Sequence, residues 1–251
     1  MEAEFLGRSV VIKMKKGERT VLWASRAVLW AVLLLVMFPV MWIVMASFSK
    51  GDSFFIAGLI PKQIAIDNYS KLFTETQFLL WVFNSLKLCL AVALIQLFLT
   101  TTAAYAFSRM RFPGRTKGLM TLLVLQVFPN SMALAGYYIL IYAFGLADSM
   151  FAVICVLSGG SAFNIWLLKA YMDGISKELD EAAYVDGAKN VTVFLYVILP
   201  LAVPQIAVIF LFSFIATYSE YMLTSVFLQS PGSFTLAIGL QSFITNQFAA
   251  H

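Results

Sequence analysis

The sequence predicts an all-α, polytopic membrane protein, and two of its features lead to this prediction. The chain is 61% hydrophobic and only 12% charged, with a mean hydropathy of +0.86, whereas soluble domains carry about 25% charged residues. Its apolar residues also gather in long runs, and a helix needs about 20 such residues to cross the hydrocarbon core of a bilayer. Because these runs lack the alternating pattern of a membrane β-barrel, we expect the chain to cross the membrane as helices.

Five segments are predicted to cross the membrane, at approximately residues 21–46, 81–107, 119–144, 150–171 and 200–228. The first follows a basic stretch, but its apolar run is too long for a signal peptide, so we expect an anchor that is not cleaved. The chain is then divided into a cytoplasmic N-terminal segment (1–20), the first transmembrane helix (21–46), an extracytoplasmic loop (47–80), a membrane core (81–228) with a cytoplasmic loop (172–199), and an extracytoplasmic segment (229–251).

Lysine and arginine residues are concentrated in alternate loops, which orients the predicted spans. They precede the first span, return between the second and third, and follow the fourth; these groups are Arg8, Lys13, Lys15, Lys16, Arg19 and Arg26, then Arg109, Arg111, Arg115 and Lys117, then Lys169, Lys177 and Lys189. Basic loops of membrane proteins are retained in the cytoplasm. We therefore expect the N-terminus and residues 172–199 to be cytoplasmic, and the net charge of +4 to reflect topology and not a nucleic-acid surface.

Enzymatic chemistry and metal binding have little support in the sequence. The phosphate-binding pattern G-x-x-x-x-G-K-[ST] is absent, so any ATP hydrolysis is expected on another chain. The only histidine is His251, and no nucleophile and base share a predicted face. Cys89 and Cys155 fall in separate spans without metal-like spacing, so we expect neither a disulfide nor a metal site. A membrane-embedded enzyme therefore lacks a credible catalytic cluster.

Residues 181–204, EAAYVDGAKNVTVFLYVILPLAVP, form a charged segment of helical pattern between two apolar segments. Gly187 can adopt the backbone angles that close a first short helix. Asn190 can cap a second one, and Pro200 permits a bend where the chain re-enters the bilayer. The segment is therefore predicted to form two short helices at the membrane surface.

The first of these helices has a small apolar face, because Leu179, Ala182 and Ala183 are at helical spacing. Glu181 and Asp186 supply charges that can fix its orientation on a partner protein. An amphipathic helix that lies at the membrane interface without a partner would show the same periodicity. Periodicity alone therefore does not decide between the two interpretations.

The same stretch matches a family motif, which consists of Glu-Ala-Ala, a Gly six positions after the Glu, and a hydrophobic-x-Leu-Pro ending. The motif residues are Glu181, Ala182, Ala183, Asp186, Gly187, Val197, Leu199 and Pro200. They resemble the cytoplasmic coupling (EAA) loop in permease subunits of binding-protein-dependent carbohydrate ABC importers, and most closely the smaller permease of the maltose/maltodextrin type. Further matches at residues 81–86, 126–129 and 145–148 extend the resemblance over approximately residues 20–250.

The resemblance implies a type I (MetI-like) permease bundle with five visible transmembrane helices and cytoplasmic coupling helices, in a bacterial inner (cytoplasmic) membrane. It implies a heterodimer with a second permease, a dimer of ATPase subunits, an extracytoplasmic sugar-binding protein and contact with membrane lipid, but no nucleic acid. ATP and Mg²⁺ would be bound by the ATPase, and no cofactor by this chain. Since members of the family usually finish with a further span, it also implies that the chain stops before a final helix.

Polar and aromatic residues within the predicted spans are candidates for lining a sugar pathway, because sugars are bound by planar hydrogen-bonding groups and aromatic faces. The candidates are Asn84, Tyr105, Gln126, Asn130, Tyr137, Asn164, Tyr218 and Glu220. Interfacial anchoring and helix packing explain the same residue types. Glu220 stands out because an ionisable group inside a bilayer is costly, although a hydrogen bond within the helix bundle explains it equally well. The glycines at 159 and 160 interrupt the fourth span, either as a bend or as a site of close helix packing.

Two alternatives to a maltodextrin permease subunit stay open at this point. A single-chain secondary transporter would need paired repeats with interrupted helices and acidic residues at mid-membrane, and only Glu220 fits that pattern. A permease of the same importer family could instead carry another oligosaccharide, a sugar alcohol or a glycerol phosphate, and the sequence does not separate these solutes.

Overall fold

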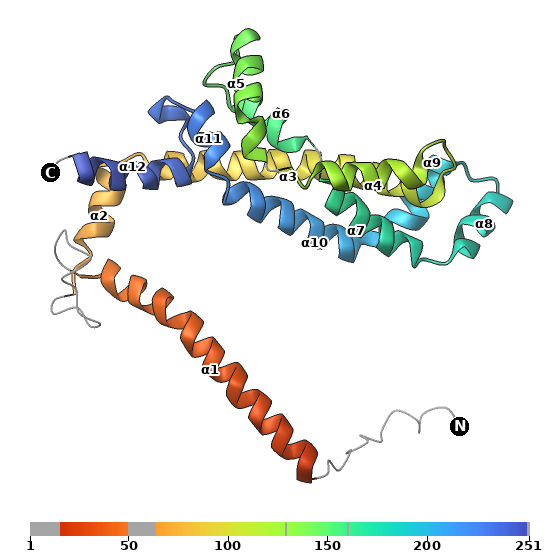
Figure 1. Ribbon diagram of the computed structural model, residues 1–251, viewed down its shortest axis with the longest axis horizontal. Helices are drawn as coiled ribbons and strands as arrows, with labels where there is room; N and C mark the ends of the chain where they lie inside the picture. The colour runs from red at the N-terminus through yellow and green to blue at the C-terminus, as the bar shows by residue number, and fades with distance from the viewer. Residues whose placement is uncertain (1–15, 50–63, 129, 160, 250–251) are drawn as a thin grey trace. The chain divides into compact units, whose positions relative to one another are not determined.

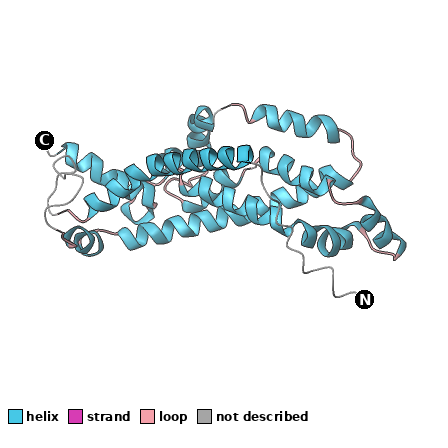
Figure 2. Ribbon diagram, turned by 90° about the horizontal axis from the view of Figure 1, so that it is seen from below, coloured by secondary structure: helices cyan, strands magenta, loops and turns pink. Residues whose placement is uncertain are grey.

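A computed structural model describes residues 16–49, 64–128, 130–159 and 161–249 of the chain. Figure 2 shows this part as helices joined by loops, and the β pairing found within it is an isolated bridge between Ser49 and Ile64. The prediction of an all-α protein is therefore confirmed.

Several features singled out in the sequence lie outside the described residues. They are most of the N-terminal segment 1–20, part of the loop 47–80, and the residues Pro129, Gly160 and His251. The chain forms two compact units, residues 1–76 and 77–251.

The first unit contains the long helix α1 (Lys16–Ser47) and the short helix α2 (Asp67–Thr74) (Figure 1). The start of α2 is tied to the end of α1, because the Asn68 side-chain amide donates hydrogen bonds to the carbonyl oxygens of Ser47 (3.2 Å) and Ser49 (3.1 Å). The bond to Ser47 satisfies a carbonyl group that the end of a helix leaves without an intrahelical partner.

The second unit is built around α3 (Phe78–Arg109), a 32-residue helix that packs against α6, α7, α10 and α12 (Figure 1). The elements that follow it are α4 (Arg115–Leu125), the 3₁₀ helix η1 (Asn130–Ala133), α5 (Leu134–Ala143), α6 (Met150–Ser158), α7 (Ala162–Asp173), α8 (Lys177–Val185), α9 (Asn190–Val193), the π-helix η2 (Phe194–Ile198), α10 (Leu199–Tyr218), α11 (Met222–Phe227), the 3₁₀ helix η3 (Pro231–Ser233) and α12 (Leu236–Ala249).

Within the described residues, three helices are long and apolar enough to cross a membrane: Arg19–Ser47 of α1, α3, and the continuous stretch Asn190–Tyr218 formed by α9, η2 and α10. The bent pair of α6 and α7 makes a fourth span when it is taken as one. The expected span 119–144 differs, because a turn and η1 divide it into α4 and α5. With 11 and 10 residues, each of these helices is too short to cross a bilayer alone.

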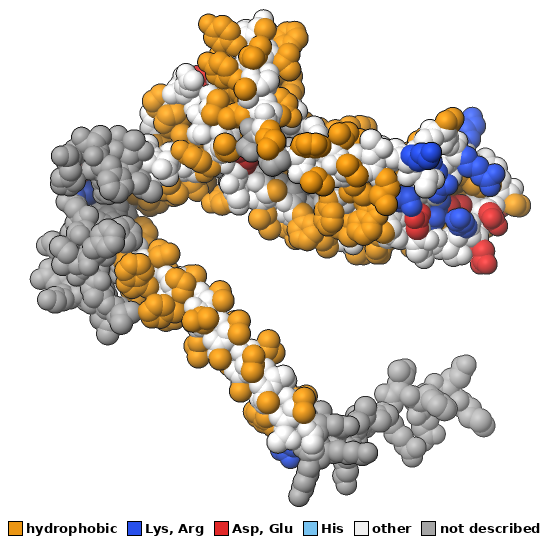
Figure 3. All heavy atoms as spheres, in the orientation of Figure 1, with side chains coloured by type: hydrophobic (Ala, Val, Ile, Leu, Met, Phe, Trp, Pro, Cys, Tyr) orange, Lys and Arg blue, Asp and Glu red, His pale blue; other side chains and the backbone are white. Residues whose placement is uncertain are grey.

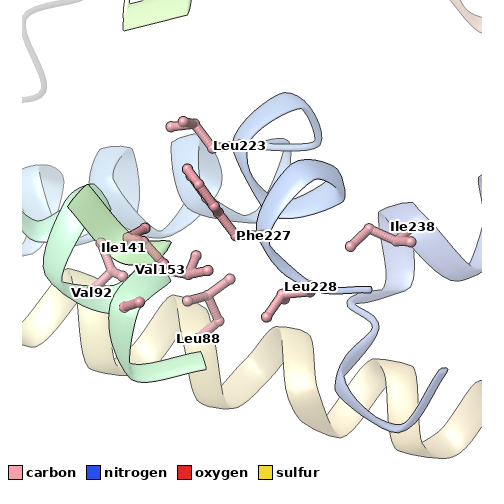
Figure 4. Packing of buried hydrophobic residues seen from close by; sticks show 9 residues of the cluster. Leu88, Val92, Ile141, Val153, Leu223, Phe227, Leu228 and Ile238 are labelled. Atoms are coloured by element: carbon pink, nitrogen blue, oxygen red, sulfur yellow. The ribbon is translucent and has the colours of Figure 1, made fainter. Parts of the chain in front are cut away.

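Two clusters of buried apolar side chains hold the second unit together. The first joins the N-terminal half of α3 to α5, α6, α11 and α12 (Figure 4); its members are Leu88, Val92, Ile141, Ala152, Val153, Leu223, Phe227, Leu228 and Ile238. The second surrounds the C-terminal half of α3 and comprises Ala104, Tyr105, Leu168, Met172, Val193, Ile198, Ala202 and Ile209. Because lipid tails are as apolar as these side chains, helices in a bilayer associate mainly through close packing.

Candidate functional site

Residues 174–193, with helices α8 and α9, are called the coupling segment here, after the loop that they resemble. The segment lies at one end of the second unit (Figure 1). Charged side chains gather at this end, whereas hydrophobic side chains dominate the rest of the visible face of the unit (Figure 3).

Helix α8 begins at a polar cap. The Ser176 hydroxyl oxygen accepts a hydrogen bond from the backbone N–H of Glu178 (3.3 Å), which satisfies one of the amide groups left free at a helix start. Glu178 and Asp180 lie in the first turn of the helix, where the helix dipole favours negative charge. The local sequence therefore specifies where α8 begins.

Helix α8 ends at Gly187, whose φ of +85° is the left-handed conformation that favours glycine. The N–H of Gly187 donates to the Tyr184 carbonyl (3.0 Å) and the N–H of Ala188 donates to the Ala183 carbonyl (2.9 Å). These two bonds form a Schellman motif, which satisfies the last carbonyl groups of a helix. The helix-closing conformation expected of Gly187 is confirmed.

The second short helix differs from the expectation. Lys189, and not Asn190, precedes the first turn of α9, and the Asn190 side-chain oxygen accepts a hydrogen bond from the Tyr184 hydroxyl (2.8 Å). α9 then continues without a break into η2 and α10. Pro200 has no N–H to donate to the residue four positions earlier; instead Leu199 donates to Phe194, so the helix widens into a π-turn where a bend was expected.

The apolar face expected on α8 is mostly exposed. Asp180 is buried and Ala183 is half-buried, and Ala183 packs against the second core cluster. Leu179 and Ala182 are exposed, as is Val185, which is 88% exposed. Leu179, Ala182 and Ala183 have the i, i+3 and i+4 spacing that places them on one helix face, but most of that face is exposed, and only Ala183, near the buried Asp180, contacts the core.

Three residues of the last two turns of α3 lie beneath the coupling segment, at the i, i+3 and i+4 positions that share a helix face: Tyr105, Ser108 and Arg109. Tyr105 donates a hydrogen bond to the Asn190 carbonyl (3.0 Å), and Ser108 donates to the Asp173 carboxylate at the end of α7 (2.6 Å). The end of α3 therefore holds both α7 and α9.

Arg109 forms the central contact of this group. Its Nε lies 2.6 Å from Asp180 Oδ2, and the two side chains are only 5% and 8% exposed. A second guanidinium nitrogen, Nη2, donates to the Ile175 carbonyl (2.9 Å). In the sequence, Arg109 stands out only as part of a basic loop, and Asp180 does not stand out, because acidic residues in the first turn of a surface helix are common and no pattern marks one as buried.

A cavity of about 460 Å³ lies between α3, the junction of α6 and α7, and α10. It is lined by Gln96, Gln126, Phe128, Tyr137, Val156, Leu157, Gly159, Ser161, Phe163, Asn164, Phe212, Ser213, Ala216 and Leu223. The lining combines side-chain amides and hydroxyls with aromatic rings.

Polar side chains in this cavity hold the junction between α6 and α7, where the chain bends by 49°. The Gln96 amide donates to the Leu157 carbonyl in the last turn of α6 (2.7 Å). Gln126 accepts from the Phe163 N–H in the first turn of α7 (3.1 Å), and Ser161 caps α7 by accepting from the Asn164 N–H (3.2 Å). Side chains thus replace backbone partners that the interrupted span has lost.

The structure brings three of the pathway candidates into this cavity: Gln126, Tyr137 and Asn164. Tyr105 is instead buried under the coupling segment. Tyr218, the last residue of α10, is 47% exposed, and the side chain of Asn130 lies outside the described residues. Gln96 was missed, although a polar residue inside a long apolar run was a signal that could have identified it.

Asn84 lies away from the cavity as well. It is buried on α3, and its side-chain amide donates to the carbonyl oxygens of Gly232 and Phe234, both at 3.0 Å. The neighbouring Ser85 hydroxyl oxygen accepts from the N–H of Leu236 at the start of α12 (2.7 Å). These contacts fasten the loop before α12 to the N-terminal half of α3.

Glu220 lies in a break between two helices, and not deep within a span as the sequence suggested. α10 ends at Tyr218, and the Glu220 carboxylate accepts hydrogen bonds from the N–H groups of Leu223 (2.7 Å) and Thr224 (3.0 Å). A carboxylate in this position satisfies free amides at the start of α11 and interacts favourably with its dipole. The geometry matches the structural interpretation of Glu220.

The turn between α5 and α6 is fastened by Asp148, which has a positive φ of 56°. Its carboxylate accepts hydrogen bonds from the N–H groups of Gln229 (2.9 Å) and Ser230 (3.2 Å), and from the hydroxyl groups of Ser230 and Ser233. Partial burial alone would raise the pKa of Asp148, but these hydrogen bonds outweigh it and lower the pKa to about 2.

Comparison with known proteins connects this geometry to a family. Residues 18–250 match the family described as "Binding-protein-dependent transport system inner membrane component". The maltodextrin transport system permease protein MdxG of Bacillus subtilis (strain 168) is 36% identical over 214 residues, which cover 85% of this chain and 77% of that protein. The maltose/maltodextrin transport system permease protein MalG of Escherichia coli (strain K12) is 35% identical over 251 residues, which cover 92% and 84%.

A third relative has a different solute in its name. The galactooligosaccharides transport system permease protein GanQ of Bacillus subtilis (strain 168) is 36% identical over 220 residues, which cover 86% of this chain and 78% of that protein. Among solved structures, a chain from the "Crystal structure of a bacterial ABC transporter involved in the import of the acidic polysaccharide alginate" has a TM-score of 0.78 and 24% identity, covering 94% of this chain and 86% of that one. This likeness shows that the two chains share a fold.

Proposed function

The chain belongs to the family of inner membrane components of binding-protein-dependent transport systems, and we propose that it is the permease subunit of an ATP-driven importer of oligosaccharides such as maltodextrin. The observation that carries this proposal is a cavity with amide and aromatic lining in a chain that is 36% identical to a maltodextrin permease. The names of its relatives also include galactooligosaccharides, so the proposed substrate class is neutral oligosaccharides, with maltodextrin the first to be tested.

The cavity chemistry supports this substrate class. Gln126 and Asn164 supply planar hydrogen-bonding groups, while Tyr137, Phe163 and Phe212 supply ring surfaces. The described residues of the lining include no Asp, Glu, Lys or Arg, so they suit a neutral solute better than a charged one. In the proposal this chain contributes half of the translocation pathway, and a second permease subunit contributes the other half.

The outer face of α8 is the proposed docking surface for a dimer of ATPase subunits. Glu181 and Ala182 of the EAA motif are exposed, next to Leu179 and Val185. In the proposal this face fits a groove on the ATPase, which binds ATP and Mg²⁺, while this chain binds no cofactor and hydrolyses nothing. Gly187 closes the helix, and Val197, Leu199 and Pro200 connect the segment to α10.

The proposed topology follows from the distribution of charge. The N-terminus and the coupling segment are placed in the cytoplasm, on the side that retains basic loops. Asp148 and residues 229–251 are then extracytoplasmic, on the side from which a sugar-binding protein would deliver the solute.

The test is to purify the chain from native membranes and to identify every attached protein by mass spectrometry. We expect a second permease, an ATPase and a sugar-binding protein, and ATP-dependent uptake of maltodextrin when the complex is placed in liposomes. Recovery of the chain alone, still able to transport without ATP, would show a single-chain secondary transporter instead. ATP-dependent uptake of another solute, but not of maltodextrin, would refute the proposed substrate and support the proposal that the complex is an importer.

A further inference from the structure

Arg109 and Asp180 form a buried ion pair beneath α8, on the side opposite the proposed docking surface. Their side chains are 5% and 8% exposed, so neither can contact an ATPase that docks on the outer face of α8. In the described part of the chain, neither Asp180 Oδ1 nor Arg109 Nε has a hydrogen-bond partner, so the contact between the two side chains is an ion pair. Arg109 is therefore the main group that compensates the charge of Asp180.

We propose that this pair is the joint through which a displacement of α8 is passed to α3, so that Arg109 and Asp180 are positioning residues for transport. The proposal rests on the proposed function, because it needs an ATPase that moves α8. It assigns the pair a role in coupling ATP hydrolysis to transport, in addition to its contribution to folding.

The position of Arg109 suits such a joint. It is the last residue of α3, an uninterrupted helix of 32 residues that also lines the cavity. Gln96 lies 13 positions earlier on the same helix, which is about 20 Å along its axis at 1.5 Å per residue. Gln96 holds the Leu157 carbonyl at the junction of α6 and α7. A displacement of the C-terminal end of α3 would therefore be transmitted along this single helix to the bent pair of α6 and α7 beside the cavity.

The chemistry of the pair suits it as well. Arg109 lies at the C-terminus of α3 and Asp180 in the first turn of α8, so each charge is at the helix end whose dipole favours it. The guanidinium forms an ion pair with Asp180 through Nε and donates a hydrogen bond to the Ile175 carbonyl through Nη2, so it holds both the first turn of α8 and the chain just before it. A lysine ammonium lacks the planar arrangement of donors needed to hold both groups in this way.

The experiment compares the wild-type complex with two neutral double variants, Arg109→Gln with Asp180→Asn, and Arg109→Met with Asp180→Leu. Replacing both partners leaves no unpaired buried charge, and apolar replacements of buried ion pairs are often tolerated. Each complete complex, with its partner permease, ATPase and sugar-binding protein, is placed in liposomes. ATP hydrolysis and maltodextrin uptake are measured in the same vesicles.

We expect the double variants to assemble and to hydrolyse ATP at close to the wild-type rate, but to move at least tenfold less sugar per ATP. A wild-type ratio in either assembled double variant would show that the pair is only structural and would overturn the proposal. Failure of both to assemble would also overturn it, since transport and assembly would then not be separable at this pair.

Two controls separate this outcome from other failures. Lys169→Gln neutralises the cation of the i,i+4 pair with Asp173, which is more exposed, and should keep the wild-type ratio of sugar to ATP. The wild-type complex must itself show ATP-dependent uptake. If it does not, the proposed function is refuted, and that result is distinct from a failure of the role proposed for Arg109 and Asp180. Arg109→Lys keeps the charge but loses the fixed geometry, so its ratio should lie between those of the wild type and the double variants.

Discussion

The two ends of α3 are fastened to distant segments by different chemistry. At the C-terminal end, Arg109 and Asp180 bring full charges together in a buried site. Toward the N-terminal end, Asn84 holds the carbonyl oxygens of Gly232 and Phe234 through a neutral amide. The Asn84 side chain and the Arg109–Asp180 pair are both buried and both reach segments far away in the sequence, so a main difference between the two contacts is the charge.

This difference predicts unequal tolerance to substitution. A neutral hydrogen bond contributes about 0.5–1.5 kcal/mol, because the alternative is a bond to water. Removing one partner of a buried ion pair costs more, since the other charge is left without compensation. The C-terminal end of α3, where the coupling segment is anchored, should therefore be the less tolerant of the two.

Asp180→Ala should give the largest loss. Because it leaves the Arg109 guanidinium buried and unpaired, we expect the local opening free energy of α8 to fall by about 3–5 kcal/mol. Hydrogen exchange of the amides in α8 and in the last turns of α3 measures this quantity in the purified complex. The control is Asp186→Ala, which removes an exposed carboxylate at the other end of α8 and should change the opening free energy by less than about 0.5 kcal/mol. If the α8 amides were equally protected from hydrogen exchange in the two variants, the buried charge at Asp180 would not explain a difference between the two ends of α3.

Asn84→Leu tests the neutral end. It removes two hydrogen bonds at 3.0 Å, so we expect the loop before α12 to lose about 1–3 kcal/mol of local stability. Amide exchange over residues 232–239 is the measurement, and Ser225→Ala, which removes an exposed hydroxyl bonded only within α11, is the control. A loss as large as that of Asp180→Ala would mean that charge is not what distinguishes the two ends.

Gly187→Ala separates backbone conformation from side-chain contacts at the coupling end. A Cβ at Gly187 would meet no atom within 4 Å, yet φ is +85°, so the expected cost of about 1–2 kcal/mol is the penalty of a left-handed conformation. Gly232→Ala is the matched control, since it also meets nothing within 4 Å but has no left-handed φ. Protection of the α8 amides should fall in the first variant only; a fall in both would point to a cause other than φ.

The fold class and the end of α8 could be predicted because each depends on local sequence. Long apolar runs predict helices in a bilayer, and a Gly after a short charged helix predicts its end. The limits of the spans were less predictable. η1 divides the expected span 119–144 and Glu220 starts a new helix after α10, and both events depend on hydrogen bonds that composition does not reveal.

The polar residues of α3 show why the candidate site could be predicted only in part. One long helix carries Asn84, Gln96 and Tyr105. The sequence does not indicate that the first contacts a loop, the second lines a cavity and the third contacts the coupling segment. Their separation follows from which distant carbonyl groups lie beside each of them: Gly232, Leu157 and Asn190. Such pairings come from tertiary packing and leave no periodic pattern in the sequence.

The smallest expected effect concerns Asp148, which carries a charge at the same end of the unit as Asn84 but is only partly buried. Its pKa is lowered to about 2 by hydrogen bonds from the loop 229–233, against about 3.9 for a free aspartate. A lowered folded-state pKa stabilises the fold above the unfolded value, and this stabilisation is lost as pH falls from about 4 toward 2.

Asp148→Asn should therefore lower the melting temperature of the purified complex by a few degrees at pH 7, and the difference between variant and wild type should shrink at pH 3. Between pH 5 and pH 8 it should stay constant, because the wild-type carboxylate is ionised in both folded and unfolded states throughout that range. A difference that persisted undiminished at pH 3 would mean that the hydrogen bonds, and not the charge, fasten this turn. Asp148 would then resemble Asn84, and charge would be decisive at the C-terminal end of α3 alone.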